Sequence, residues 1–268
     1  MSLVDLEVDS QVALITLKDI KNGNRLNFDL LALLERTVKE SLTDPTVRVI
    51  VLRSAAEAFC MGMDLGQVGS KDNDATREAL KPYGEVLFSL YTSPKPVVCL
   101  LDGAVKAGGV GIACACDIVL SSAQTTFELG EILFGLIPAN VLPYLLAQRL
   151  NPQKARYIVL TAKNLCAEEA YRLGLVDELF AEEEFEKGVR GVIKGLLRSS
   201  PWALAEVKSF TQLLLGKDLK EARAMATEKF IKMVNRPDVL RGIEAFKAGE
   251  LPDWFSRYRP QKPLTREE

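Results

Sequence analysis

The sequence predicts an α/β protein in which strands and helices alternate over the first two thirds of the chain and helices alone fill the rest. Short β-branched runs recur from residue 3 to residue 180, and segments with apolar residues three or four positions apart separate them. Beyond about residue 181 only the helical pattern continues. We therefore expect a mixed core over residues 1–195 and a helical region over 196–268, in a chain of 268 residues that can bury a sizeable core.

The first elements are two strands, a helix and a third strand. The two strands are expected at residues 3–8 and 12–17. Asn27 suits the N-cap of an amphipathic helix, and Asp44 with the proline after it should end that helix. Residues 47–52 are almost continuously apolar, which indicates a strand buried on both faces.

A loop over residues 53–70 and a polar stretch over 71–76 come next. We expect the polar stretch to be a mobile flap that leads into a helix, whose apolar positions are Leu80, Tyr83, Leu87 and Leu90. Residues 96–101 predict another buried strand, and the glycine-rich turn 107–111 then opens a short helix that reaches Cys116. A strand, a glycine turn and a helix in this order form a βα unit.

The remaining elements follow the same reasoning. Strands are expected at 118–121, 125–129 and 175–180, and helices at 143–150, at 152–160 and from residues 182, 201 and 219. The tail from Trp254 is polar, and we expect its end to be mobile.

The composition excludes several kinds of chemistry. The chain has no histidine, so catalytic systems that need imidazole and metal sites ligated by histidine are ruled out. Acid and base work near neutral pH must come from a carboxylate with a raised pKa, or from Lys, Tyr or Cys. With 34 basic and 36 acidic residues, the charge balance predicts neither a nucleic acid partner nor a membrane surface.

The five cysteines are Cys60, Cys99, Cys114, Cys116 and Cys166. Their odd number, the absence of a CxxC pair and the absence of a secretory leader favour reduced core residues in a cytoplasmic protein.

Three segments are candidates for a catalytic site. Gly108 stands at the start of a predicted helix, where free N–H groups can bind an anion, although the two glycines by themselves are more typical of a tight turn without a ligand. Asp64 lies in a second turn that contains glycine, and its carboxylate either takes part in catalysis or holds that loop. Glu131 is the only charge in residues 129–137, so its carboxylate is either paired or has a raised pKa.

At these residues the sequence resembles the crotonase, or enoyl-CoA hydratase/isomerase, superfamily. The resemblance rests on the order of its pieces along the chain, which is more specific than any one of them. These pieces are residues 25–27, 47–52, 59–65, 95–96, 103–104, 108–109, 116–117, Phe127 with Glu131, and 173–177.

The resemblance implies a spiral of repeated ββα units followed by a helical region used for trimer formation. It also implies an oxyanion hole made by the backbone N–H groups of Met63 and Gly108, which binds a thioester carbonyl. Typical hydratases of the family use two glutamates. The second matches Glu131, and Gly111 stands where the first would be.

A closer similarity is to the dehydratases of polyketide β-branching cassettes, which also lack the first glutamate. It is carried by residues 127–143, 153–157, 107–111 and 249–254. These relatives dehydrate 3-hydroxy-3-methylglutaryl-acyl carrier protein to 3-methylglutaconyl-acyl carrier protein. The resemblance implies no metal or redox cofactor. The phosphopantetheine arm comes with the substrate.

Glu131 is the expected base, and Asp64 is the other candidate acid. Asn140 could bind the substrate hydroxyl or cap a helix. The distal carboxylate of the substrate needs a donor, for which the candidates are Tyr83, Lys106, Arg77 and Lys81.

Two other functions compete with dehydration. One is an enoyl-CoA hydratase, isomerase or decarboxylase on the same scaffold. The other is a scaffold without catalysis that binds a carrier protein. The expected partners are an acyl thioester on a carrier protein or on CoA and further copies of the chain, in a homotrimer or a hexamer.

Overall fold

In the computed structural model, which describes residues 2–68 and 73–265, the strands form two sheets. The larger sheet has the order β1-β2-β3-β4-β6-β9, and the smaller has the order β5-β7-β8. The β1–β2 pair is antiparallel, and every other neighbouring pair of the larger sheet is parallel. The strands of the larger sheet are β1 (Val4–Asp9), β2 (Val12–Leu17), β3 (Val49–Ser54), β4 (Val97–Leu101), β6 (Ile118–Ser122) and β9 (Glu178–Phe180).

The first helix begins and ends where the sequence predicts. The side chain of Asn27 accepts a hydrogen bond of 2.8 Å from the N–H of Leu30 at the start of α1 (Phe28–Thr43), and Asp44 is its C-cap. The following strand is shifted by two residues from its expected place at 47–52.

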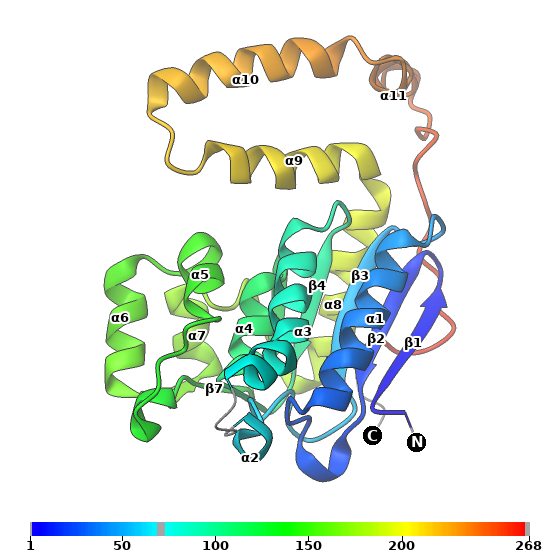
Figure 1. The fold of residues 1–268 in the computed structure, drawn as a ribbon. Helices are drawn as coiled ribbons and strands as arrows, with labels where there is room; N and C mark the ends of the chain where they lie inside the picture. The colour runs from blue at the N-terminus through cyan, green and yellow to red at the C-terminus, as the bar shows by residue number, and fades with distance from the viewer. Residues whose placement is uncertain (1, 69–72, 266–268) are drawn as a thin grey trace.

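Both faces of the larger sheet are covered, as Figure 1 shows. Ile50 and Leu52 of β3 pack in one apolar cluster with α1, α3 (Asn73–Thr92) and α4 (Gly108–Ala115). Val49 and Val51 face the opposite cluster, which contains α8 (Glu182–Arg198). This alternation confirms that β3 is buried on both faces.

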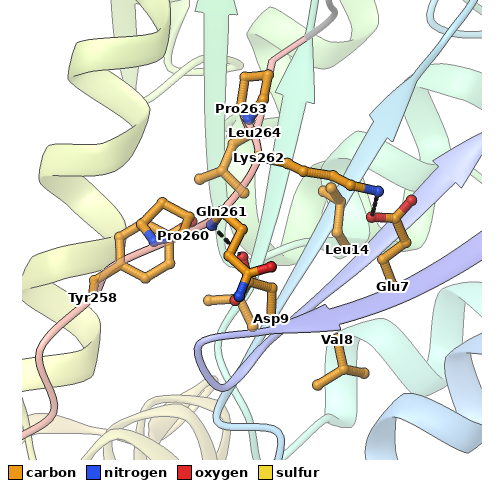
Figure 2. Close-up of a pocket in the computed structure, with 11 residues that line it drawn as sticks. Glu7, Val8, Asp9, Leu14, Tyr258, Pro260, Gln261, Lys262, Pro263 and Leu264 are labelled. Carbon is orange, nitrogen blue, oxygen red and sulfur yellow. Dashed lines mark hydrogen bonds and ion pairs between the residues drawn. The ribbon is translucent and has the colours of Figure 1, made fainter.

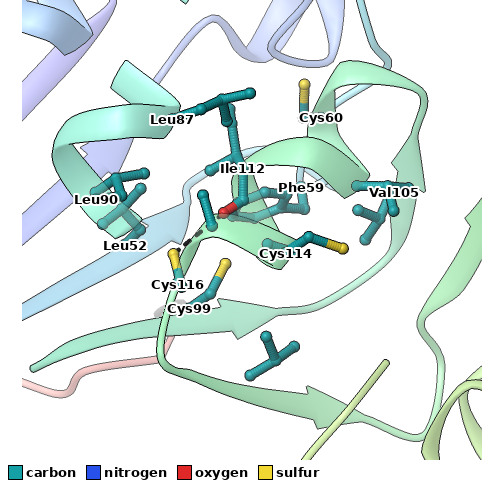
Figure 3. Close-up of a cluster of buried hydrophobic side chains, with 14 of the residues drawn as sticks. Leu52, Phe59, Cys60, Leu87, Leu90, Cys99, Val105, Ile112, Cys114 and Cys116 are labelled. Carbon is teal, nitrogen blue, oxygen red and sulfur yellow. Dashed lines mark hydrogen bonds between the residues drawn. The ribbon is translucent and has the colours of Figure 1, made fainter. Parts of the chain in front are cut away.

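Four of the five cysteines are buried, and Figure 3 shows them in the first of these clusters, with Cys99 and Cys116 close together. All five cysteines are free thiols in the structure. The prediction of a core position was wrong for Cys166, which is exposed because it lies at the N-cap of α7 (Ala167–Leu173).

The smaller sheet comprises β5 (Ala104–Lys106), β7 (Thr126–Glu128) and β8 (Leu165–Cys166). The strand expected at 125–129 is β7. The sequence pattern missed β5 and β8, because strands of two or three residues are too short to show a period. The short helix α2 (Leu65–Val68) lies in the segment expected to be a loop. Of the expected flap, residues 73–76 belong to α3, and residues 71 and 72 lie outside the described residues.

A group of short helices follows β7. The three-residue helix α5 (Leu142–Tyr144) continues into a π-helical turn over Leu145–Arg149, and α6 (Pro152–Thr161) follows it. None of the helices in the described ranges combines the length and the apolar character that are needed to cross a membrane.

The last three helices extend away from the sheet layers in Figure 1. They are α9 (Pro201–Leu214), α10 (Leu219–Val234) and α11 (Pro237–Ala248), and none of them contains a fully buried residue. Lys208 of α9 connects them to the core, since its Nζ lies 2.5 Å from Oδ2 of Asp117. The boundary expected near residue 195 falls inside α8, and the division into two parts stays a prediction.

The tail after Trp254 packs against the core. Tyr258 and Leu264 are buried in the cluster that contains α8, and the Arg53 guanidinium donates hydrogen bonds to the carbonyls of residues 263–265. The expected mobile end falls on residues 266–268, outside the described residues.

Candidate active site

Two loops from different parts of the chain lie side by side at the start of α4. Cys60 and Val105 form a parallel bridge, and the N–H of Lys106 donates a hydrogen bond of 2.8 Å to the Cys60 carbonyl. Three residues beyond Cys60 is Met63, and three residues beyond Val105 is Gly108. The fold therefore brings together the two segments that carry the candidate oxyanion donors.

Among the residues that the structure describes, the backbone N–H groups of Met63 and Gly108 do not hold these loops. The bridge between Leu26 and Met63 uses the N–H groups of Leu26 and Asp64 instead. In residues 2–68 and 73–265, neither Met63 nor Gly108 donates its N–H to a backbone carbonyl. Gly108 is the first residue of α4, where the positive end of the helix dipole adds to the attraction for an anion.

The two loops pack closely where they meet, and each has a residue with positive φ there. Gly62 has a φ of +82°, and a Cβ at this position would lie 2.9 Å from the Cβ of Ala107. Ala107, the N-cap of α4, has a φ of 46° and a ψ of −113°, a conformation that costs a residue with a Cβ on the order of 1–3 kcal/mol. Such strain is common at functional sites.

Glu131 reaches this place through the smaller sheet. β5 and β7 pair in parallel with Lys106 opposite Glu128, and the N–H of Ala107 donates 2.8 Å to the Glu128 carbonyl. Glu131 follows three residues later at the start of a 3₁₀ turn over Glu131–Phe134. Its position next to the α4 start is thus a consequence of strand register.

One carboxylate oxygen of Glu131, Oε2, is buried and has no hydrogen-bond partner among the described residues. Burial raises the pKa of Glu131, a hydrogen bond to its own backbone N–H opposes the rise, and the nearby Glu128 carboxylate raises the pKa further. A carboxylate in this state holds a proton more readily than an exposed one. It fits a general base that can return the proton as an acid.

Tyr83, one of the candidate donors for the distal carboxylate, is buried, as expected of an apolar position of its helix. Its side chain is only 2% exposed, and its hydroxyl donates a hydrogen bond of 2.8 Å to the Gly108 carbonyl. A helical face that carries Leu87 and Leu90 in the core also carries Tyr83 into the core, and the absence of a side chain at Gly111 leaves space for the hydroxyl.

The other candidates have different surroundings. Asp64 accepts a hydrogen bond of 3.1 Å from the N–H of Gly66, the second residue of α2. Lys106 forms an ion pair of 2.7 Å with Glu128. Asn140 is exposed and caps no described helix, because Val141 is the N-cap of α5.

Arg77 and Lys81 are exposed on α3. They lie one helical turn apart on the helix that also carries Tyr83.

A cavity of about 470 Å³ lies elsewhere in the molecule, between the β1–β2 hairpin and the C-terminal tail. Figure 2 shows Lys262 and Glu7 paired at one side of it and Tyr258 at another. None of the residues expected to form the active site lines this cavity. The chemistry predicted from the sequence therefore does not belong there.

Comparisons with known proteins agree with the fold and with the resemblance. A family model described as enoyl-CoA hydratase/isomerase matches residues 7–257. A bacillaene synthase dehydratase, PksH, of Bacillus subtilis (strain 168) is 30% identical over 257 residues, which cover 93% of this chain and 95% of that protein. A 2,3-dehydroadipyl-CoA hydratase of Escherichia coli (strain K12) is 26% identical, with 96% of this chain and 100% of that protein covered.

A crystal structure assigned as an enoyl CoA hydratase/isomerase (crotonase) from Legionella pneumophila superposes with a TM-score of 0.89 at 27% identity, covering 95% of this chain and 99% of the other. The protein is therefore an α/β enzyme with the crotonase fold. It belongs to the enoyl-CoA hydratase/isomerase family, and it is an enzyme of the hydratase and dehydratase type.

Proposed function

We propose that the protein dehydrates 3-hydroxy-3-methylglutaryl-acyl carrier protein to 3-methylglutaconyl-acyl carrier protein. The observation that carries the proposal is the buried carboxylate oxygen of Glu131, which has no hydrogen-bond partner among the described residues. It lies beside two loops in which the N–H groups of Met63 and Gly108 donate to no backbone carbonyl of those residues. The similarity to a bacillaene synthase dehydratase over 93% of the chain supports this reaction over others of the family.

One carboxylate is sufficient for this reaction. The thioester oxygen lies between the N–H groups of Met63 and Gly108, and Glu131 takes a proton from the α-carbon. The C–H electron pair forms the enolate, which collapses to the C=C bond as the β C–O bond breaks. The protonated Glu131 gives its proton to the departing oxygen, so the products are the enoyl thioester and one water.

The two N–H groups stabilise the step that forms charge. Negative charge grows on the thioester oxygen as the α-proton leaves, and fixed donors are most valuable where charge develops. Loss of one such donor typically costs on the order of 10² to 10³ in rate.

Lys106 forms an ion pair with Glu128, and the hydroxyl of Tyr83 donates a hydrogen bond to the Gly108 carbonyl. We propose that Arg77 or Lys81, both exposed on α3, binds the distal carboxylate of the substrate. Replacing each by methionine tests this, with an increase in KM as the expected result.

We also propose that α9, α10 and α11 pack against further copies of the chain in a homotrimer or a hexamer. These helices contain no fully buried residue and expose large apolar side chains, which is unfavourable in water. The exposed apolar residues on them include Val207, Leu213, Leu219, Phe230, Ile231, Leu240 and Phe246. Light scattering should give the mass of three or six chains, and a monomer at working concentration would contradict it.

The test of the reaction is intact-protein mass spectrometry of the acylated carrier protein. Incubation with the wild-type enzyme should remove one water, about 18 mass units, from 3-hydroxy-3-methylglutaryl-carrier protein. The same acyl group on CoA serves as a second substrate. Faster reaction of the CoA thioester would favour a CoA-linked hydratase, as the similarity to the Escherichia coli enzyme would suggest.

Glu131→Gln separates an enzyme from a binding scaffold. A scaffold would show no loss of water with either form and would bind the carrier protein equally well in both. If neither thioester loses water with the wild-type protein, isomerisation of enoyl-CoA substrates is the next reaction to measure.

A further inference from the structure

The hydroxyl of Tyr83 lies among groups of the candidate site without belonging to the proposed proton transfer. It donates 2.8 Å to the carbonyl of Gly108, the residue whose N–H is the second proposed oxyanion donor. Burial raises the pKa of Tyr83 well above its ordinary value, and the neighbouring thiols and Glu131 also raise it. The phenol therefore stays protonated and remains a donor.

The space for this hydroxyl is created by Gly111. A Cβ at Gly111 would lie 2.2 Å from the Tyr83 oxygen, which is far inside contact distance. Val141 also borders this space, because its Cγ2 would lie 3.1 Å from that Cβ. A side chain at residue 111 would therefore displace the hydroxyl of Tyr83 from this space.

The hydrogen bond holds the first turn of α4 from outside the helix. Gly108 is the first residue of the helix, so its N–H has no partner within the helix that could fix its direction. An external bond to the carbonyl of the same residue restricts the orientation of the whole residue. A misplacement of about 1 Å in a catalytic group can cost on the order of 10² in rate.

We propose that Tyr83 is a positioning residue for the oxyanion hole, and that its hydroxyl, in the space left by Gly111, holds Gly108 in the orientation that stabilises the enolate. The inference rests on the proposed function, because the enolate is that of the dehydration. It gives Tyr83 a different role from binding of the distal carboxylate.

The first test is Tyr83→Phe, which removes one oxygen and keeps the ring. We expect kcat for the carrier-linked substrate to fall on the order of 10-fold, with KM within about twofold, because an oxyanion hole binds the transition state better than the substrate. A variant with the wild-type kcat would overturn the proposal.

A pair of double variants separates the hydrogen bond from the packing. In Tyr83→Phe/Gly111→Ser, the serine hydroxyl can donate to the carbonyl three residues earlier in the helix, which is that of Gly108. In Tyr83→Phe/Gly111→Ala, the same space is filled without a donor, and the nearest remaining ring atom, Cζ, is 3.4 Å from the new Cβ. We expect the serine variant to recover most of kcat and the alanine variant to recover none.

Equal recovery of kcat with serine and with alanine at residue 111 would mean that the Tyr83 hydroxyl only fills space. Recovery of kcat with neither residue would mean that the loss in Tyr83→Phe does not come from a missing hydrogen bond to the Gly108 carbonyl. Both results overturn the proposal. Hydrogen exchange of residues 107–112 provides a readout that does not need turnover. Exchange should rise in Tyr83→Phe and return to the wild-type level only with serine at 111. If the wild-type protein dehydrates nothing, the proposed function fails, while unchanged exchange would reject the role of Tyr83.

Discussion

Lys106 and Glu128 face each other in the β5–β7 ladder, with the Lys106 Nζ 2.7 Å from Oε2 of Glu128. This ion pair influences the proposed base, since the Glu128 carboxylate raises the pKa of Glu131. The lysine compensates a charge that would otherwise act on Glu131 more strongly.

The first prediction concerns Lys106→Met. Without the cation, Glu128 should raise the pKa of Glu131 further. Since the base must be ionised to accept the α-proton, the acidic limb of the kcat/KM profile should move to higher pH, and activity at pH 6 should fall relative to pH 8. Lys106→Arg keeps the charge and serves as the control. An acidic limb that stays in place, or moves to lower pH, would contradict this coupling.

The second prediction concerns the stability of Glu131→Gln. The pKa of Glu131 is higher in the folded protein than its ordinary value of 4.5, so the folded state binds the proton more tightly than the unfolded state. Stability linked to this proton is present below pH 4.5 and is lost as pH rises through the raised pKa. Glutamine resembles the protonated acid and avoids this loss.

Glu131→Gln should therefore melt about 2 °C above the wild type at pH 8, and the difference should shrink towards pH 5. Thermal unfolding at both pH values measures this. Glu250→Gln, at an exposed position, is the control and should show no gain at pH 8. A destabilised Glu131→Gln at pH 8 would show that the carboxylate is a structural group and not a strained catalytic one.

The third prediction concerns the contact between the two loops. Gly62→Ala places a Cβ 2.9 Å from that of Ala107 and forces the loops of Met63 and Gly108 apart. Gly249→Ala is a matched control, since its φ of +70° is similar to the +82° of Gly62 and nothing lies within 4 Å of the new Cβ.

Both variants should lose about 1 kcal/mol to backbone strain. Only Gly62→Ala should also lose kcat, by on the order of 10-fold or more, because it alone moves the oxyanion donors. Urea unfolding and initial rates measure the two effects. Similar kcat values for the two variants would mean that the spacing of the loops is not critical.

Much of the fold follows from local patterns. Asn27 begins α1 and Asp44 ends it as expected, because a cap and a proline act through neighbouring backbone atoms. The continuous apolar run of β3 indicated burial on both faces, although its boundaries were off by two residues. Such features need no knowledge of distant segments.

The features that local patterns missed depend on contacts between distant segments. β5 pairs with β7 over three residues, and no period is visible in so short a strand. The helical pattern placed Tyr83 among apolar positions, but only the folded chain shows that its hydroxyl fills the space at Gly111 and donates to the Gly108 carbonyl. The tail residue Tyr258 is buried on the sheet for the same reason, since its polar neighbours gave no sign of a core position.

The central claim is that Glu131 carries the proton while Asp64 holds the loop. It is tested most directly by the rates of water loss from 3-hydroxy-3-methylglutaryl-carrier protein with Glu131→Gln and Asp64→Asn. The asparagine oxygen can keep the 3.1 Å hydrogen bond from Gly66, so we expect Asp64→Asn to lose less than about tenfold in kcat. Glu131→Gln should lose on the order of 10³ or more. A rate near that of the wild type with Glu131→Gln, together with an inactive Asp64→Asn, would contradict the account.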